Sequence, residues 1–282
     1  MKKELTKNIS IAMFTWAFCF FLAFTTGANS LILISLILIF SIQNFFSIFS
    51  IIFKTDLFFD FVGSGTFFLV VFWSLISSPN IDSNKIIISL LILIWSLRLG
   101  YFLTSRRVSH GKDKRLMKIF NSPGGTFMAW NIQGFWIFCC LLSSLNSIYS
   151  ENIFKFGLLQ WSGLLLWIIG FLIEVISDEQ KKVFNKNNTD KSRFISSGLW
   201  SISRHPNYLG EIILWLGIFI ISFTYLENWS YLSVISPVSI IIILRFVSGV
   251  PQLEKNAIKK WGGNKEYKKY KDKTPVLFPK IF

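Results

Sequence analysis

Long apolar tracts separated by short polar segments constrain this chain more than any other feature of its sequence. A helix needs about 20 mostly apolar residues to cross the hydrocarbon core of a bilayer. Tracts of that kind predict eight spans, near residues 9–26, 30–53, 57–78, 86–104, 127–148, 156–177, 208–225 and 230–249. Only 16% of the residues are charged, against about 25% in a soluble domain. We therefore expect an all-α fold, a polytopic transmembrane helical bundle.

The basic residues indicate how these spans are oriented. If the N-terminus is cytoplasmic, 25 of the 29 lysine and arginine residues fall in inside segments. Lys85 and Lys155 fall in outside loops, and Arg98 and Arg245 fall within spans. Membrane proteins typically carry such an excess of lysine and arginine in their cytoplasmic loops. The sequence thus predicts an integral, multi-pass membrane protein whose basic loops and both termini are cytoplasmic.

The net charge of +14 is explained by the same arrangement. The cations lie in short loops beside apolar tracts and in the tail, where they would face anionic lipid headgroups. They lack the basic face of a folded nucleic-acid-binding module. We expect the membrane lipid bilayer as a partner and no nucleic acid, and we infer no obligate protein partner.

The chain changes in character near residue 125. Residues 1–125 are rich in Phe, Ile and Leu and form N-terminal transmembrane helices, whereas residues 126–282 form a C-terminal transmembrane domain with cytoplasmic loops and a tail. Polar residues become dense from about residue 170, which is where we look for chemistry. Cys19, Cys139 and Cys140 lie in apolar tracts without a CxxC pattern or a neighbouring histidine, so no metal site is predicted.

A first candidate group ends the sixth predicted span. Glu174, Asp178 and Lys182 are four residues apart and share one face of a helix. A carboxylate within apolar sequence is costly and indicates function by default, and Glu174 is such a residue. The alternative is a helix that simply leaves the membrane, with lysines at its C-terminal end favoured by the helix dipole.

The richest polar stretch runs from Gly198 to Glu211. Arg204 and His205 precede Pro206, which suits the first turn of a helix. The free N–H groups at a helix N-terminus favour an anion. This place would therefore suit a phosphate or a pyrophosphate.

The helix that follows carries further polar side chains. Asn207 and Glu211 are four residues apart and present an amide and a carboxylate on one face. The structural alternative is a capping turn with two interfacial anchors, Trp200 and Tyr208. That alternative does not explain why the Glu211 carboxylate enters apolar sequence.

The tail after the last predicted span is rich in lysine and in spaced aromatic residues, including Tyr267 and Tyr270. As a polybasic anchor it would be attracted to anionic lipid by about 1 kcal/mol per cation at the surface. The aromatic residues favour instead a folded lid that closes over a ligand near Arg204. Both interpretations are open.

Four motifs in order resemble the steroid 5-alpha-reductase-like membrane proteins, and among them a bacterial, uncharacterised branch similar to the C-terminal domain of those reductases. The signature is Arg204-His205-Pro206-Asn207-Tyr208-x-Gly210-Glu211. The other motifs are Glu174-x3-Asp178-x-Gln180-Lys181-x2-Phe184, Ser248-Gly249-x-Pro251-x2-Glu254 and Tyr267-x2-Tyr270-x3-Thr274. The resemblance covers roughly residues 95–282, and it extends to sterol reductases and isoprenylcysteine carboxyl methyltransferases.

This resemblance implies a helical membrane reductase that takes NADPH from the cytosol. The substrate would be a flat, hydrophobic enone, such as a sterol- or prenyl-type lipid, and hydride would go to a carbon–carbon double bond conjugated to a carbonyl. By position, Asp178, Arg204 and Asn207 would contact the cofactor, and Glu211 would orient its nicotinamide end. We expect further cofactor-binding residues at Glu174, Lys182, Arg193, Trp200, His205, Tyr208, Glu254, Tyr267 and Tyr270. The sequence has no GxGxxG unit, so this nucleotide site would not be a Rossmann site.

The catalytic group for the substrate carbonyl is less clearly defined. Steroid reductases use a tyrosine and a carboxylate from their early helices, and here Trp95 stands where the tyrosine would align. Tyr101 lies one helical turn further on, while Asp60 and Arg98 are intramembrane charges that need partners. These three residues and Glu211 are the catalytic candidates. A purely structural ion pair is equally open for the two charges, and the proton donor stays unassigned.

Two other functions stay open at this point. Membrane methyltransferases that use S-adenosylmethionine share the Arg-His-Pro-x-Tyr turn and the C-terminal glutamate. The Asn207-Tyr208-x-Gly210-Glu211 ending favours the reductase. A non-catalytic lipid-binding membrane protein is the third option, because the early tyrosine is missing.

Overall fold

The computed structural model describes residues 2–27, 30–110, 119–188, 190 and 193–278, and these residues form helices, turns and short loops without a β-strand. Eight helical segments are long and apolar enough to cross a membrane. They are Lys3–Thr26, Ser30–Ile52, Phe59–Ile76, Ser83–Arg107, Pro123–Ile148, Leu158–Asn187, Pro206–Tyr225 and Asn228–Trp261. The predicted all-α fold with eight spans is confirmed. The side of the membrane on which the loops and termini lie stays a prediction.

The chain packs into two compact units. The first contains Met1–Gln160 and Ile221–Ser236, and the second contains Trp161–Ile220 and Pro237–Phe282. This division follows packing, whereas the predicted division into residues 1–125 and 126–282 follows sequence character and stays a prediction.

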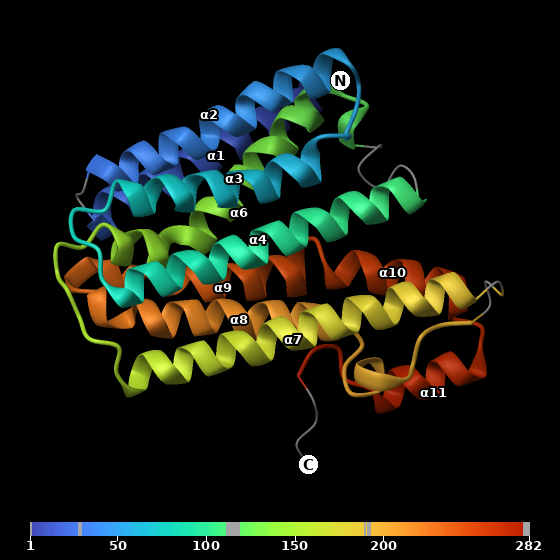
Figure 1. Ribbon diagram of the computed structural model, residues 1–282. Helices are drawn as coiled ribbons and strands as arrows, with labels where there is room; N and C mark the ends of the chain where they lie inside the picture. The colour runs from blue at the N-terminus through green and yellow to red at the C-terminus, as the bar shows by residue number, and fades with distance from the viewer. Residues whose placement is uncertain (1, 28–29, 111–118, 189, 191–192, 279–282) are drawn as a thin grey trace. The chain divides into compact units, whose positions relative to one another are not determined.

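Helix α6 forms the core of the first unit. The helices of this unit are α1 (Lys2–Gly27), α2 (Ser30–Ile52), α3 (Phe59–Ile76), α4 (Ser83–His110), α6 (Pro123–Ile148), η2 (Phe223–Tyr225) and η3 (Asn228–Val234) (Figure 1). Ser122 begins α6 by accepting a hydrogen bond from the Gly125 N–H at 3.1 Å, and Pro123 occupies its first turn. The mean hydropathy of α6 is 1.3, the lowest of the eight segments, yet it is the most buried. A span surrounded by α1, α2, α3 and α4 tolerates polar and small residues, because they pack against helices rather than lipid.

A buried cation holds one end of the first unit together. The Lys85 side chain is fully buried, and its Nζ donates to the carbonyl oxygens of Asn80 at 2.6 Å and Ser150 at 2.5 Å. The same Nζ lies 5.5 Å from the ring centroid of Tyr225. The Tyr225 hydroxyl donates to the Asp82 carboxylate at 2.5 Å. Segments far apart in the sequence thus meet around one ammonium group.

The second unit holds most of α7 (Leu158–Asn187), α8 (Pro206–Ser222) and α9 (Ile235–Ile242), together with η1 (Gly198–Ser201), the π-helix η4 (Ile243–Val247), α10 (Val250–Trp261) and α11 (Lys265–Lys273) (Figure 1). Helices α7 and α8 approach backbone to backbone. A Cβ added to Gly210 would lie 2.6 Å from both the Gly170 carbonyl oxygen and the Glu174 nitrogen. Small residues allow such close contacts between membrane helices. This contact places the beginning of α8 beside the polar end of α7.

Candidate functional site

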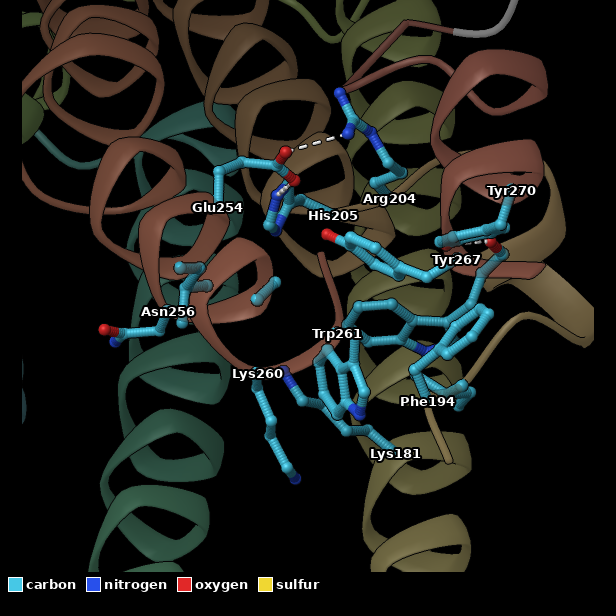
Figure 2. Close-up of a pocket in the computed structure, with 14 residues that line it drawn as sticks. Lys181, Phe194, Arg204, His205, Glu254, Asn256, Lys260, Trp261, Tyr267 and Tyr270 are labelled. Atoms are coloured by element: carbon cyan, nitrogen blue, oxygen red, sulfur yellow. Dashed lines mark hydrogen bonds and ion pairs between the residues drawn. The ribbon is translucent and has the colours of Figure 1, made fainter. Parts of the chain in front are cut away.

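A cavity of about 230 Å³ lies within the second unit, between the end of α7, the turn before α8, and helices α10 and α11. Five aromatic side chains contribute to its walls: Phe194, Trp200, Trp261, Tyr267 and Tyr270. Besides the two tyrosines, its charged or ionisable lining residues are Lys181, Arg204, His205, Glu254 and Lys260. In Figure 2 the cluster of Arg204, His205 and Glu254 lies toward one end of the cavity, and Lys181, Phe194 and Trp261 lie toward the other.

The turn that carries Trp200 is attached firmly to α7. Gly198 adopts a φ of +62°, and a Cβ at this position would lie 2.5 Å from the Gln180 side chain. Gln180 accepts a hydrogen bond from the Leu199 N–H at 3.1 Å through its Oε1. The Trp200 indole N–H donates to the Ser177 carbonyl oxygen at 3.0 Å. The indole ring is therefore held in the wall by bonds to the helix behind it.

The C-terminal tail folds back onto the same turn. Asn264 caps α11 by accepting a hydrogen bond from the Glu266 N–H at 2.8 Å. The Tyr270 hydroxyl then donates to the Trp200 carbonyl oxygen at 2.6 Å, and the Arg204 N–H donates to the Pro275 carbonyl oxygen at 2.9 Å. The tail is thus a folded part of the cavity wall. Its closure over a ligand stays a prediction.

One carboxylate holds both basic residues that precede α8. The Arg204 Nη1 donates to the Glu254 Oε2 at 2.8 Å, and the His205 Nε2 lies 3.0 Å from the Glu254 Oε1. Two buried nitrogens of this cluster, Arg204 Nε and His205 Nδ1, have no hydrogen-bond partner in the described part of the chain. Buried polar groups are usually hydrogen-bonded, and an exception calls for a missing partner such as a ligand or a water.

Two lysines stand over indole rings at the edge of this cavity. The Lys181 Nζ lies 4.8 Å from the Trp200 ring centroid, and the Lys260 Nζ lies 4.4 Å from that of Trp261. With Arg204 they supply three positive charges, against the single carboxylate of Glu254. The cavity is therefore positively charged and aromatic, which favours an anionic ligand with a flat ring.

His205 gives this cluster a dependence on pH. Burial is the main cause that lowers the pKa of His205 below its ordinary value of 6.5; Lys181 and Arg204 lower it further, and Glu254 opposes the shift. The unfolded chain then binds the proton more readily than the fold does. The contribution of His205 to stability is therefore full above about pH 6.5 and is lost as the pH falls through the lower folded-state pKa.

We expect the melting temperature of the detergent-solubilised protein to decrease from about pH 7.5 to about pH 5.5, and to decrease less in His205→Gln. Glutamine keeps a polar group near Glu254 but does not titrate in this range. Thermal unfolding of both proteins at the two pH values measures the difference. Parallel curves for the two proteins would show that His205 is not the titrating group.

The structure brings six of the twelve predicted cofactor-binding residues to the cavity. These are Trp200, Arg204, His205, Glu254, Tyr267 and Tyr270. Tyr208 is not among the lining residues, but its ring lies 5.7 Å from that of His205. Burial raises the pKa of the Tyr267 and Tyr270 hydroxyls, so both stay protonated at neutral pH.

The other predicted cofactor residues lie elsewhere in the second unit. Glu174 and Asp178 on α7 are 3% and 5% exposed, and Asn207 on α8 is half-buried; none of the three lines the cavity. Lys182 and Arg193 are exposed and pair with neighbouring carboxylates, at 3.2 Å to Glu179 and 3.9 Å to Asp190 respectively. Whether these five residues bind a cofactor stays a prediction.

The catalytic candidates are divided between the two units. Glu211 is buried on α8 in the second unit. In the first unit Tyr101 is 78% exposed, Arg98 places its guanidinium 5.1 Å from the Phe102 ring centroid, and Asp60 lies in the first turn of α3. Their roles stay predictions.

A buried ion pair in the first unit was not foreseen from the sequence. Arg107 donates to both carboxylate oxygens of Asp56 at 2.8 Å, and the Asp56 side chain is 3% exposed. Asp56 lies in a short polar break between two predicted spans, where a solvated residue is the ordinary expectation. Its partner is 51 residues away, so no local pattern identified the pair.

Several wall residues were absent from the predicted set, among them Lys181, Phe194, Lys260 and Trp261. Trp261 follows Glu254 by seven residues, so helical periodicity places both on one face of α10. This periodicity could have identified Trp261 as a wall residue. Adjacent helical residues point about 100° apart, so Lys181 reaches the cavity whereas Lys182 reaches solvent. Phe194 lies in an irregular segment and has no comparable signal.

Comparison with known proteins identifies a family. The family described as "Protein of unknown function (DUF1295)" matches residues 45–274. An uncharacterized protein of Schizosaccharomyces pombe is 27% identical over 147 residues, which cover 45% of this chain and 40% of that protein. A probable O-methyltransferase of Ustilaginoidea virens is 36% identical over 47 residues, which cover 17% of this chain and 16% of that protein. The chain thus matches less than half the length of these curated relatives, and no solved structure matches it.

The family match includes all four sequence motifs and every residue that lines the cavity. It also includes six of the eight candidate spans in full, from Phe59 onward. The match covers 230 of the 282 residues. The chain belongs to the DUF1295 family, a steroid 5-alpha-reductase-like family of membrane proteins.

Proposed function

We propose that this protein is an integral membrane oxidoreductase that uses NADPH to reduce a carbon–carbon double bond conjugated to a carbonyl in a hydrophobic, sterol- or prenyl-type lipid. The observation that carries the proposal is the buried Arg204 Nε, which has no partner among the described residues and belongs to an aromatic, positively charged cavity. Such a donor favours a ligand that brings an acceptor, and arginine binds phosphate oxygens particularly well.

The charge of the cavity favours NADPH over S-adenosylmethionine. NADPH brings a pyrophosphate and a 2′-phosphate, whereas S-adenosylmethionine brings a sulfonium and an ammonium group beside one carboxylate. Arg204, Lys181 and Lys260 outnumber the Glu254 carboxylate. A site with this balance attracts the polyanion and disfavours the cationic ligand.

The size of the cavity suits one part of a dinucleotide. Its volume is about 230 Å³, whereas sites that enclose a whole small ligand measure about 300–1,000 Å³. The aromatic walls offer flat faces for a ring, and the cationic edge offers donors for phosphate oxygens. The cavity would therefore enclose part of the cofactor.

The residues of this chain would hold and orient the cofactor. Glu254 fixes Arg204 and His205 at 2.8 and 3.0 Å, which leaves the Arg204 Nε available to a phosphate oxygen. Bonds from Trp200 to α7 and from Tyr270 to the turn set the aromatic walls before a ligand arrives. Such preorganisation lowers the cost of binding in a productive geometry. When bound, NADPH supplies the hydride for the reduction.

Consumption of NADPH tests this proposal. The purified protein in detergent micelles should oxidise NADPH only when a lipid-like α,β-unsaturated ketone is present. Mass spectrometry should then find a product heavier than the substrate by two hydrogen atoms.

Two results would contradict the proposal. Methyl transfer from S-adenosylmethionine to a lipid, without NADPH consumption, would indicate a methyltransferase, in keeping with the short similarity to the probable O-methyltransferase of Ustilaginoidea virens. Inactivity with both cofactors and no ligand-induced stabilisation of the folded protein would indicate a lipid-binding role.

A further inference from the structure

The outer surface of α10 and α11 carries a concentration of lysines that the cavity does not use. Six of them are exposed, and we call them the basic face: Lys255, Lys259, Lys265, Lys268, Lys269 and Lys273. The exposed acidic residues of the two helices are Glu266 and Asp272. The basic face therefore has a marked excess of positive charge.

The opposite side of the same helices carries the cavity wall. Glu254 and Trp261 on α10 and Tyr267 and Tyr270 on α11 all line the cavity. These four side chains point away from the basic face. The six lysines of the basic face are exposed and do not line the cavity.

The basic face begins within the last candidate span, Asn228–Trp261, after its apolar part. Phe246 and Val247 are 66% and 64% exposed, as expected of side chains that face lipid. After a break at Ser248–Gly249, the first lysine of the face is Lys255 on α10, eight residues beyond Val247. The potential of an anionic membrane surface is screened over about 8–10 Å, so these lysines interact with it only where α10 and α11 lie against the headgroups.

Apolar side chains are interspersed with these lysines. Ile258 on α10 is 48% exposed, and Phe278 after α11 is 59% exposed. Lysines mixed with exposed apolar side chains are typical of segments that lie in the headgroup region of a bilayer. Neither the six lysines nor these two apolar residues line the cavity, so ligand binding there does not explain why they are exposed.

We propose that the basic face of α10 and α11 binds the headgroups of anionic phospholipids in the membrane that holds the protein. The lysines neutralise lipid phosphates, while Ile258 and Phe278 enter the boundary between headgroups and acyl chains. Because the reverse side of these helices carries Glu254 and Tyr267, anionic lipid also stabilises the cavity wall.

Amide hydrogen exchange of the full-length protein in lipid nanodiscs tests this proposal. Exchange of the α11 amides should be about tenfold slower in discs that contain phosphatidylglycerol than in discs of phosphatidylcholine alone. The combined variant Lys265→Gln, Lys268→Gln, Lys269→Gln should lose this difference. The matched variant with arginine at the same three positions should keep it, because arginine retains the charge.

The same experiment gives the results that would overturn the proposal. Equal exchange of α11 in the two kinds of disc, or equal slowing in wild type and the glutamine variant, would exclude lipid binding by this face. Slowing in phosphatidylcholine discs by soluble glycerol phosphate would indicate a site for a free anion instead. If the glutamine variant does not fold, a salt control on the wild-type protein decides. About 0.5 M salt should abolish the slowing of α11 exchange if headgroups cause it, and slowing that persists in this salt would contradict the proposal. No nucleotide is added, so the outcome is independent of the proposed function.

Discussion

Arg204→Gln is expected to weaken NADPH binding by about 10- to 100-fold, because a hydrogen bond to a charged group contributes about 1.5–3 kcal/mol. The substitution removes both the positive charge and the Nε donor, which has no protein partner in the described residues. It also leaves Glu254 with His205 as its remaining bonded partner in this cluster. Titration of the purified protein with NADPH, followed by ligand fluorescence, measures the dissociation constant.

Arg193→Gln is the matched control for this prediction. Arg193 is among the predicted cofactor-binding residues, but its side chain is 74% exposed and pairs with Asp190 at 3.9 Å. Exposed ion pairs contribute about 0–1 kcal/mol, so this substitution should change NADPH affinity by less than about fivefold. An equal loss of affinity in the two variants, or no loss in Arg204→Gln, would contradict the geometry of the cavity.

Lys85→Met is expected to lower the free energy of unfolding by about 3 kcal/mol, the order of magnitude for breaking a buried polar cluster by removing one partner. Methionine fills a similar volume but donates no hydrogen bond to the carbonyl oxygens of Asn80 and Ser150. It also removes the cation near Tyr225. Chemical unfolding of the variant and of wild type in the same detergent measures the difference.

Lys155→Met provides the comparison for this effect. Lys155 is exposed in the first unit, and surface substitutions usually change stability by less than about 0.5 kcal/mol. The prediction fails if Lys85→Met unfolds at the same denaturant concentration as Lys155→Met. Such a result would mean that the surrounding loops satisfy their carbonyl oxygens without the ammonium group.

The spans of this protein could be predicted because their cause is local. About 20 apolar residues in a row are required wherever a helix crosses a bilayer, whatever lies beside it. The burial of each span could not be predicted in the same way. Helix α6 is the least apolar span and the most buried, because other helices surround it, and hydropathy contains no information about neighbours.

The contacts within the candidate site could not be predicted from the sequence either. The motif that ends in Glu211 located Arg204 and His205, and a separate motif located Glu254, but their spacing of about 50 residues says nothing about contact. Only the fold of the tail brings the carboxylate to 2.8 Å from the guanidinium. Phe194 joins the wall from an irregular segment, where no periodicity marks the side that faces inward.

Ligand-dependent melting of the purified protein most directly tests whether this cavity binds an anionic nucleotide. NADPH at about 100 times its dissociation constant should increase the free energy of unfolding by about 2.7 kcal/mol, and the same concentration should stabilise Arg204→Gln much less. S-adenosylmethionine should have little effect on either protein. Stabilisation by S-adenosylmethionine alone, or an equal effect of NADPH on wild type and Arg204→Gln, would contradict binding of NADPH at Arg204.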